Sequence, residues 1–274
     1  MESYEEVFKN HNGFVSHKWV HYFYIYDKLF WEYRQKNLPL TIMEIGVDRG
    51  GSLEIWKKYL PEGSKIYGVD INPQCEKINF SENIFFHLGS AADRAFMEKT
   101  FAGLEFDIIL DDGSHICSDV IETFKIMFPR IKAGGLYVVE DLHTSYWGNY
   151  GGGCRKKGSS IEYFKNFVEA LNADYIHSFG SLRLFSKYLS RNFKDNVKQV
   201  LKKNVVKKYF SGIDYSKSIE ALSFYDSICA IKKFACPKDG SFKSVISGNE
   251  NIGEVNCFRN EEESIQKVKR MFLG

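Results

Sequence analysis

The chain has 274 residues, of which 44% are hydrophobic, 16% aromatic and 26% charged. This is the composition of a globular protein with one large α/β domain or two small ones, and a formal net charge of +2 is too balanced to indicate nucleic-acid binding. The six cysteines form no Cys-x-x-Cys pair and have no zinc-like spacing, the N-terminus is too polar for a signal peptide, and no apolar run approaches the ~20 residues of a membrane helix. We therefore expect a cytoplasmic protein with reduced thiols.

The first residues are predicted to be helical. Trp19, Phe23, Tyr26 and Phe30 follow one another at helical spacing, so we expect them to share one face. We assign 1–38 to a helical segment that covers the main domain, which we place at 39–180.

Strands and helices alternate through the main domain. The breaks at Pro61 and at Asn72-Pro73 separate successive elements. Buried strands are predicted at 40–46, 65–71, 83–89, 106–112 and 134–141, and helices at 50–60, 94–101, 118–131 and 160–172. Because the strands are apolar on both faces, we expect an α/β fold with a parallel sheet that helices cover on both sides.

The C-terminal part departs from this alternation. Residues 181–215 are predicted to be a basic helical insertion, with nine Lys or Arg between 183 and 208 against one acid. A solvated surface explains such a run, and so does a patch that attracts an anionic acceptor or a membrane surface. Lys187, Arg191, Lys194, Lys198 and Lys202 would share its cationic face. Residues 216–274 are predicted to contain two strands within 219–233, with a turn near Tyr225-Asp226, and then a polar tail.

The stretch MEIGVDRGGS (43–52) predicts a strand, a Gly-rich turn and a helix, which is typical of a nucleotide-cofactor site. Asp70 ends the next strand, where a carboxylate accepts ribose hydroxyls. The dinucleotide fingerprint requires glycine at the position of Asp48, whose carboxylate would repel a pyrophosphate but tolerate a cationic sulfonium. This favours S-adenosylmethionine over NAD; the alternative is a tight turn that binds no ligand. Ser90 either contacts the adenine or caps the next helix.

Two acidic pairs follow neighbouring strands: Asp111-Asp112 and Glu140-Asp141. Parallel strands end at the same edge of a sheet, so these four carboxylates should lie together and would repel one another without a cation. Their oxygens suit Mg²⁺. The alternative is that one acid of each pair caps a helix. His115 lies in the same loop and is a candidate general base, as is His143, although a loop histidine can equally be a packing residue.

The motifs EIGVDRGGS, GVDINP, DIILDDGSH, GGLYVVEDLHTSYW and SFYDSICAIKK resemble those of the sugar O-methyltransferases of macrolide antibiotic biosynthesis and their relatives in bacterial polysaccharide clusters. The resemblance covers about residues 16–180 and the C-terminal hairpin. It implies a Rossmann-like class I methyltransferase fold with a seven-stranded, mostly parallel sheet, S-adenosylmethionine and Mg²⁺ as cofactors, and a homo-oligomer. It also implies that the segment SHKWVHY covers the active site.

Carried over by motif, Asp112, Glu140 and Asp141 would be metal ligands and His115 the catalytic base, acting beside Asp112. The cofactor site would comprise Glu44, Gly46, Asp48, Gly50, Ser52, Asp70, Ser90 and Asp111. His143, Tyr146 and Trp147 would lie on the substrate side, where the two aromatic rings either stack on a sugar or pack in a lid.

The function expected from these features is Mg²⁺-dependent methylation of a sugar hydroxyl on a glycan, a capsule or lipopolysaccharide precursor, or a glycosylated natural product. The protein would act in the cytoplasm or at the inner surface of the membrane. Two alternatives stay open: an NAD-type oxidoreductase on the same fold, and a non-catalytic cofactor-binding subunit of a sugar- or antibiotic-modifying complex.

Overall fold

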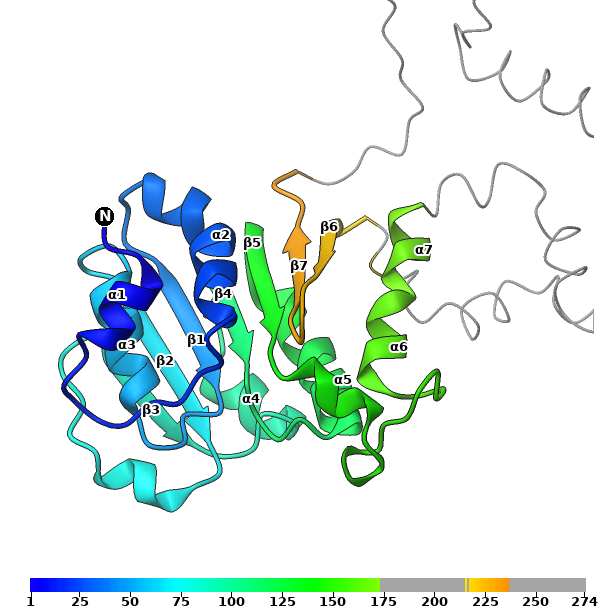
Figure 1. The fold of residues 1–274 in the computed structure, drawn as a ribbon, viewed down its shortest axis with the longest axis horizontal. Helices are drawn as coiled ribbons and strands as arrows, with labels where there is room; N and C mark the ends of the chain where they lie inside the picture. Colours follow the sequence, from blue (N-terminus) through cyan, green and yellow to red (C-terminus); the bar gives the residue numbers. More distant parts are fainter. Residues whose placement is uncertain (173–214, 216, 237–274) are drawn as a thin grey trace, which may run out of the picture.

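The computed structural model describes residues 1–172, 215 and 217–236, and these residues form a seven-stranded sheet (Figure 1). Its order is β3-β2-β1-β4-β5-β7-β6. The first five strands are parallel, and β7 runs antiparallel between β5 and β6. Their bounds are β1 Thr41–Ile45, β2 Lys65–Asp70, β3 Ile84–Leu88, β4 Phe106–Asp111, β5 Ile131–Val139, β6 Ile219–Phe224 and β7 Cys229–Lys233. The predicted mostly parallel sheet with a C-terminal hairpin is confirmed.

The strand order reverses between β1 and β4, because β2 and β3 lie on one side of β1 while β4 and β5 lie on the other. The chain therefore leads from β1 and from β4 to helices on opposite faces of the sheet, α3 (Gly51–Tyr59) after β1 and α5 (Cys117–Met127) after β4. Open α/β sheets bind ligands at such a point.

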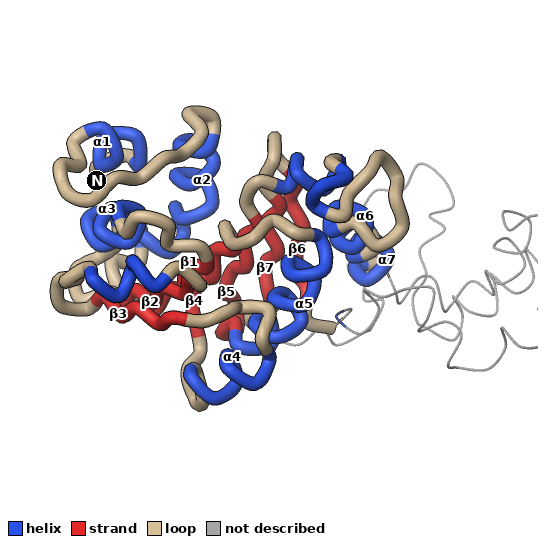
Figure 2. The backbone as a smooth tube through the Cα atoms, turned by 90° about the horizontal axis from the view of Figure 1, so that it is seen from below, coloured by secondary structure: helices blue, strands red, loops and turns tan. Residues whose placement is uncertain are grey.

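Helices cover both faces of the sheet. The first face carries α1 Tyr4–Lys9, α2 Tyr22–Gln35 and α3 Gly51–Tyr59, and the second carries α4 Arg94–Thr100, α5 Cys117–Met127, α6 Ser160–Lys165 and α7 Phe167–Leu171. Figure 2 shows the sheet between these two groups. Short 3₁₀ helices connect the elements: η1 Pro73–Lys77, η2 Phe128–Arg130, η3 Leu142–Tyr146 and η4 Gly148–Tyr150.

Two predicted helices differ in extent from the observed ones. The helix expected at 118–131 ends at Met127, where Pro129 cannot continue the hydrogen-bond ladder and η2 follows. The helix expected at 160–172 is interrupted at Asn166 and forms α6 and α7.

Two apolar cores lie on opposite faces of the sheet. Along β1, Ile42 faces the first core and Met43 faces the second, as the twofold alternation of a strand requires. Both side chains are fully buried. The central strands are thus covered on both sides, as their sequences predict, whereas the strand predicted to be buried at 83–89 forms the edge strand β3 and exposes Phe85 and Leu88.

The helices α1 and α2 pack onto α3 through aromatic rings. Phe30 stacks on Trp56 at a centroid distance of 5.1 Å, and Tyr4 lies 4.7 Å from the same indole. The predicted helical face holds for Phe23, Tyr26 and Phe30, which are buried, but it is wrong for Trp19. This residue precedes α2 and is 48% exposed, because its indole N–H donates to Asp141 across the sheet edge.

The basic insertion at 181–215, apart from Tyr215, lies outside the described residues, and so does the tail after residue 236. Every helix within the described part falls short of the length and apolar character that a bilayer span needs.

Candidate active site

A cavity of about 490 Å³ opens at the carboxyl edge of the sheet, between the loops that follow β1, β2, β3 and β4. Six acidic side chains line it, and as far as the structure describes the chain no lysine or arginine does. The acidic residues are Asp48, Asp70, Asp111, Asp112, Asp119 and Asp141. Such a cavity favours a cationic ligand and disfavours a pyrophosphate.

The Gly-rich turn touches the loop that carries Asp112. Gly46 has φ +89°, and a Cβ added to it would lie 1.9 Å from the backbone oxygen of Asp112. Glycine is therefore required for the approach of the two loops as well as for the turn. Gly50, also left-handed at φ +87°, precedes the first turn of α3 but is not among the lining residues.

Asp70 organises the same turn. Its Oδ2 accepts hydrogen bonds from the backbone N–H groups of Val47 (2.7 Å) and Asp48 (2.9 Å), and its Oδ1 accepts one from Asn72 (2.8 Å). A carboxylate offers about four acceptor positions, so it retains capacity for one further donor from a ligand. Of the predicted cofactor residues, Gly46, Asp48, Asp70, Ser90 and Asp111 line the cavity. The cap of the helix after Ser90 is Asp93.

Besides Gly50, the predicted cofactor residues Glu44 and Ser52 do not line the cavity. Glu44 is fully buried between β1 and α3, where its carboxylate accepts hydrogen bonds from Ser52 Oγ (2.5 Å) and Trp56 Nε1 (3.2 Å). Burial raises the pKa of Glu44. Because successive side chains of β1 alternate between faces, Ile45 lines the cavity while Glu44 does not. As a correction to the predicted set, Glu44 and Ser52 attach α3 to the sheet.

The side chain of Asp111 is buried beside Tyr137 of the second core. Its Oδ2 accepts a hydrogen bond from Tyr137 Oη at 3.0 Å. Burial raises the pKa of Asp111 to about 7. The Oδ2 of Asp112 instead accepts a hydrogen bond from Lys18. The two neighbouring acids therefore have different partners.

Asp112, His115 and Asp141 converge. One ligand atom from each lies within 4.8 Å of the others, and His115 Nε2 is 3.9 Å from Asp112 Oδ1 and 3.7 Å from Asp141 Oδ2. His115 (φ +56°) and Asp141 (φ +48°) both have left-handed backbones. A non-glycine residue retains such strain mainly where the surrounding structure demands it, often at functional sites. Two carboxylates and an imidazole at this separation fit a divalent cation.

Glu140, the third predicted metal ligand, is turned inward and does not belong to this group of three. Its Oε2 accepts a hydrogen bond from Lys18 Nζ at 2.7 Å, and its carboxylate also interacts with the buried Tyr26 hydroxyl. Burial raises the pKa of Glu140, against the opposing effect of the Lys18 ammonium.

Sequence reasoning missed Lys18. It lies between α1 and α2, and its side chain is 3% exposed. Although burial alone lowers the pKa of Lys18, the carboxylates of Asp112, Glu140 and Glu44 raise it well above the usual range. The available signal was its place in SHKWVHY, the segment whose resemblance implies that it covers the site.

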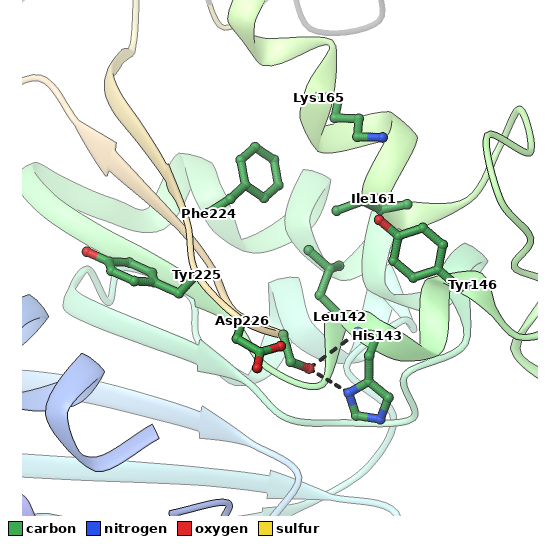
Figure 3. A pocket seen from close by; sticks show the side chains of 9 residues that line it. Leu142, His143, Tyr146, Ile161, Lys165, Phe224, Tyr225 and Asp226 are labelled. Atoms are coloured by element: carbon green, nitrogen blue, oxygen red, sulfur yellow. Dashed lines mark hydrogen bonds between the residues drawn. The ribbon is translucent and has the colours of Figure 1, made fainter. Parts of the chain in front are cut away.

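A second cavity of about 360 Å³ lies between η3, α6 and the turn of the β6–β7 hairpin (Figure 3). His143 and Tyr146 line it together with Lys165. His143 Nδ1 and Ser227 Oγ share a hydrogen bond of 2.5 Å, which attaches the histidine to the hairpin turn. Trp147 is 52% exposed and not among the lining residues, although its ring centroid lies 4.9 Å from that of His143. Of the two candidate bases, His115 is the one beside the acids.

No protein-family model matches the chain. The strand order, the antiparallel hairpin and the cavity at the switch point define the class I methyltransferase fold. The solved structure of MycE methyltransferase from the mycinamycin pathway, in complex with Mg and SAH, is similar with a TM-score of 0.64 and 27% identity, over 85% of this chain and 55% of that one.

The chain is also similar in sequence to sugar O-methyltransferases of antibiotic pathways. It is 37% identical over 158 residues to mycinamicin VI 2''-O-methyltransferase of Micromonospora griseorubida and 35% identical over 172 residues to demethylmacrocin O-methyltransferase of Streptomyces fradiae. These matches cover 53% and 58% of this chain, but 38% and 42% of those proteins. The chain thus spans about two fifths of the length of these curated relatives. The resemblance that the motifs predict is confirmed.

Proposed function

We propose that the protein transfers a methyl group from S-adenosylmethionine to a sugar hydroxyl in a reaction that requires Mg²⁺. The observation that carries the proposal is the convergence of Asp112, His115 and Asp141 at the edge of a cavity lined by acidic side chains. The similarity to sugar O-methyltransferases supports it.

The acidic cavity suits the cationic methyl donor. Asp70 would accept a ribose hydroxyl with its remaining acceptor position, while it continues to hold the turn at Val47 and Asp48. Asp48 and Asp111 would face a positively charged ligand without the repulsion that a pyrophosphate would meet. The lining therefore disfavours the NAD-type alternative.

The acceptor hydroxyl would lie beside His115. When bound, S-adenosylmethionine supplies an electrophilic methyl group, and Mg²⁺ supplies a charge that orients neighbouring hydroxyls and lowers their pKa. Asp112 and Asp141 would hold the ion. As the new C–O bond forms and the S–CH₃ bond breaks, His115 takes the hydroxyl proton and later releases it to solvent. The adjacent carboxylates stabilise the imidazolium that forms, and S-adenosylhomocysteine is the second product.

The second cavity is where we place the remainder of the acceptor. Tyr146 and Ile161 offer it apolar surface, and Lys165 offers a charge at its rim. His143 would contact the acceptor from its fixed position beside Ser227.

We further propose that the acceptor is anionic, because the chain concentrates nine Lys or Arg between 183 and 208. A nucleotide-linked or lipid-linked glycan has this chemistry, and its assembly would place the protein in the cytoplasm or at the inner membrane surface. The acceptor KM should then rise with salt; a KM that does not change between low and high salt would exclude an anionic acceptor. A homo-oligomer, which the resemblance implies, is measurable by light scattering.

The deciding experiment measures S-adenosylhomocysteine formation with a panel of nucleotide sugars and oligosaccharides, with and without EDTA. We expect turnover that EDTA abolishes and Mg²⁺ restores. A thermal-shift comparison separates the alternatives, since S-adenosylhomocysteine should raise the melting temperature and NADH should not. Binding of S-adenosylhomocysteine without turnover on any acceptor would instead favour the accessory-subunit alternative.

A further inference from the structure

A buried lysine lies behind the candidate metal centre. The Lys18 Nζ is 2.5 Å from Asp112 Oδ2, 2.7 Å from Glu140 Oε2 and 3.8 Å from Glu44 Oε1. The lysine side chain is 3% exposed, and those of Glu140 and Glu44 are 1% and 0% exposed. An ammonium group is buried to this degree only where carboxylates compensate the loss of water.

The two oxygens of Asp112 face different partners. Oδ2 binds the ammonium of Lys18, while Oδ1 lies on the side of His115 and the group of three. The acidic cluster is therefore divided into an inner part, which the protein supplies with its own cation, and an outer part, which it leaves to solvent or a ligand. Asp112 belongs to both.

We propose that Lys18 is a built-in counter-cation of the candidate metal centre. It is a positioning residue: it holds Asp112 and Glu140 against their mutual repulsion and leaves the outer oxygens of Asp112 and Asp141 for a divalent ion. This inference deepens the proposed function and rests on it for the identity of the outer cation.

The same contact attaches the segment between α1 and α2 to the site. Trp19 Nε1 (3.2 Å) and Tyr22 Oη (2.6 Å), which follow Lys18 in the chain, donate to Asp141 Oδ1, and His17, which precedes it, lines the first cavity. Residues 17–22 thus reach both acids of the outer group.

Removal of Lys18 should therefore have two effects, one on the stability of the metal-free protein and one on its affinity for the ion. Without the ammonium, Asp112, Glu140 and Glu44 would be buried together with no cation, so the metal-free protein should lose stability. A divalent ion on Asp112, however, is repelled by an ammonium on the other oxygen of the same carboxylate, so removal of Lys18 should strengthen its binding. A purely structural lysine would produce the first effect without the second.

The test compares Lys18→Met with Lys9→Met, in which an exposed lysine paired with Glu5 is lost. Melting temperatures are measured in EDTA, and Mg²⁺ affinity is measured by isothermal titration calorimetry. We expect Lys18→Met to lower the metal-free melting temperature by roughly 10 °C and to bind Mg²⁺ about tenfold more tightly than wild type. Lys9→Met should match wild type in both.

If Lys18→Met does not fold, Mg²⁺ affinity is compared between Glu140→Gln and the double variant that carries both Glu140→Gln and Lys18→Met. The double variant loses one negative and one positive charge, so the buried cluster stays balanced. The double variant should bind Mg²⁺ about tenfold more tightly. An unchanged or weaker Mg²⁺ affinity in the informative pair overturns the inference. If wild type itself binds no Mg²⁺, the proposed function fails, and the metal-free melting temperature alone decides whether Lys18 compensates the buried acids.

Discussion

His115 Nε2 lies 3.7 Å from Asp141 Oδ2, although the two residues follow different strands of the sheet. Both have left-handed backbone conformations, at φ +56° and φ +48°. The adjacent carboxyl ends of β4 and β5 bring the loops together, and the strained conformations aim the side chains at one another. We propose that this pair, with Asp112, deprotonates the acceptor hydroxyl.

Removal of either outer carboxylate should abolish the metal dependence. In Asp112→Asn or Asp141→Asn, the ion loses a charged ligand, and we expect turnover to fall on the order of 100-fold or more. S-adenosylhomocysteine binding, measured by calorimetry, should stay within a few-fold of wild type. The control is Glu62→Gln, which removes a carboxylate from an exposed loop. Wild-type kcat in either asparagine variant would contradict the metal assignment.

His115→Gln tests the base. It retains a polar side chain but cannot take up a proton, so kcat should fall by about 10²–10⁴-fold. Mg²⁺ affinity should change little if the imidazole acts as a base and not as a ligand. His143→Gln is measured in parallel, and a larger loss of kcat there than at His115 would move the base to the residue that the hairpin holds.

Gly46→Ala should damage both the fold of the site and cofactor binding. The new Cβ would overlap the backbone oxygen of Asp112, at 1.9 Å, in a residue with φ +89°. The matched control is Gly103→Ala, which is equally left-handed at φ +75° but has nothing within 4 Å of an added Cβ. Gly103→Ala should cost about 1–2 kcal/mol from backbone strain alone, and Gly46→Ala should cost more in urea denaturation. Equal losses of unfolding free energy in the two variants would show that the loop at Asp112 moves aside for the new Cβ at little cost.

The half-buried His87 of β3 should make stability depend on pH. Burial lowers the pKa of this imidazole, whose ring packs edge-on to Phe101 at a centroid distance of 5.0 Å. Below about pH 6.5 the unfolded chain therefore binds a proton more readily than the folded protein. Stability should be fully present above that pH and fall as the pH drops through the folded-state pKa.

The measurement for His87 is the difference in melting temperature between about pH 7.5 and pH 5.5. His87→Phe keeps an aromatic ring in place and removes the titration, so this difference should shrink. Identical differences in the variant and in wild type would assign the pH dependence to other groups.

The first three strands could be predicted from the sequence because each is an apolar run with glycine, proline or asparagine close to its ends. The meeting of Asp112, His115 and Asp141 followed from the parallel arrangement alone, since every strand of such a sheet ends at the same edge. The side-chain directions did not follow. Glu44 immediately precedes the lining residue Ile45, and Glu140 immediately precedes the lining residue Asp141. Twofold alternation places neighbouring side chains on opposite faces of a strand, but it does not tell which face holds the crevice.

Lys18 could not have been found by periodicity or composition. A single lysine in a polar segment ordinarily lies in water, because burial of an unpaired ammonium is prohibitively costly. Its burial depends on carboxylates that lie 94 and 122 positions away in the chain. Only the three-dimensional arrangement brings these charges together.

The contact between Gly46 and the carbonyl of Asp112 joins two loops through main-chain atoms. The turn proposed to cradle the methyl donor and the loop proposed to carry the proton acceptor are thereby held in register by the polypeptide itself. Side chains on either loop can vary to suit different acceptors without disturbing that spacing. An insertion in either loop, by contrast, would separate donor from acceptor even if every functional side chain were retained.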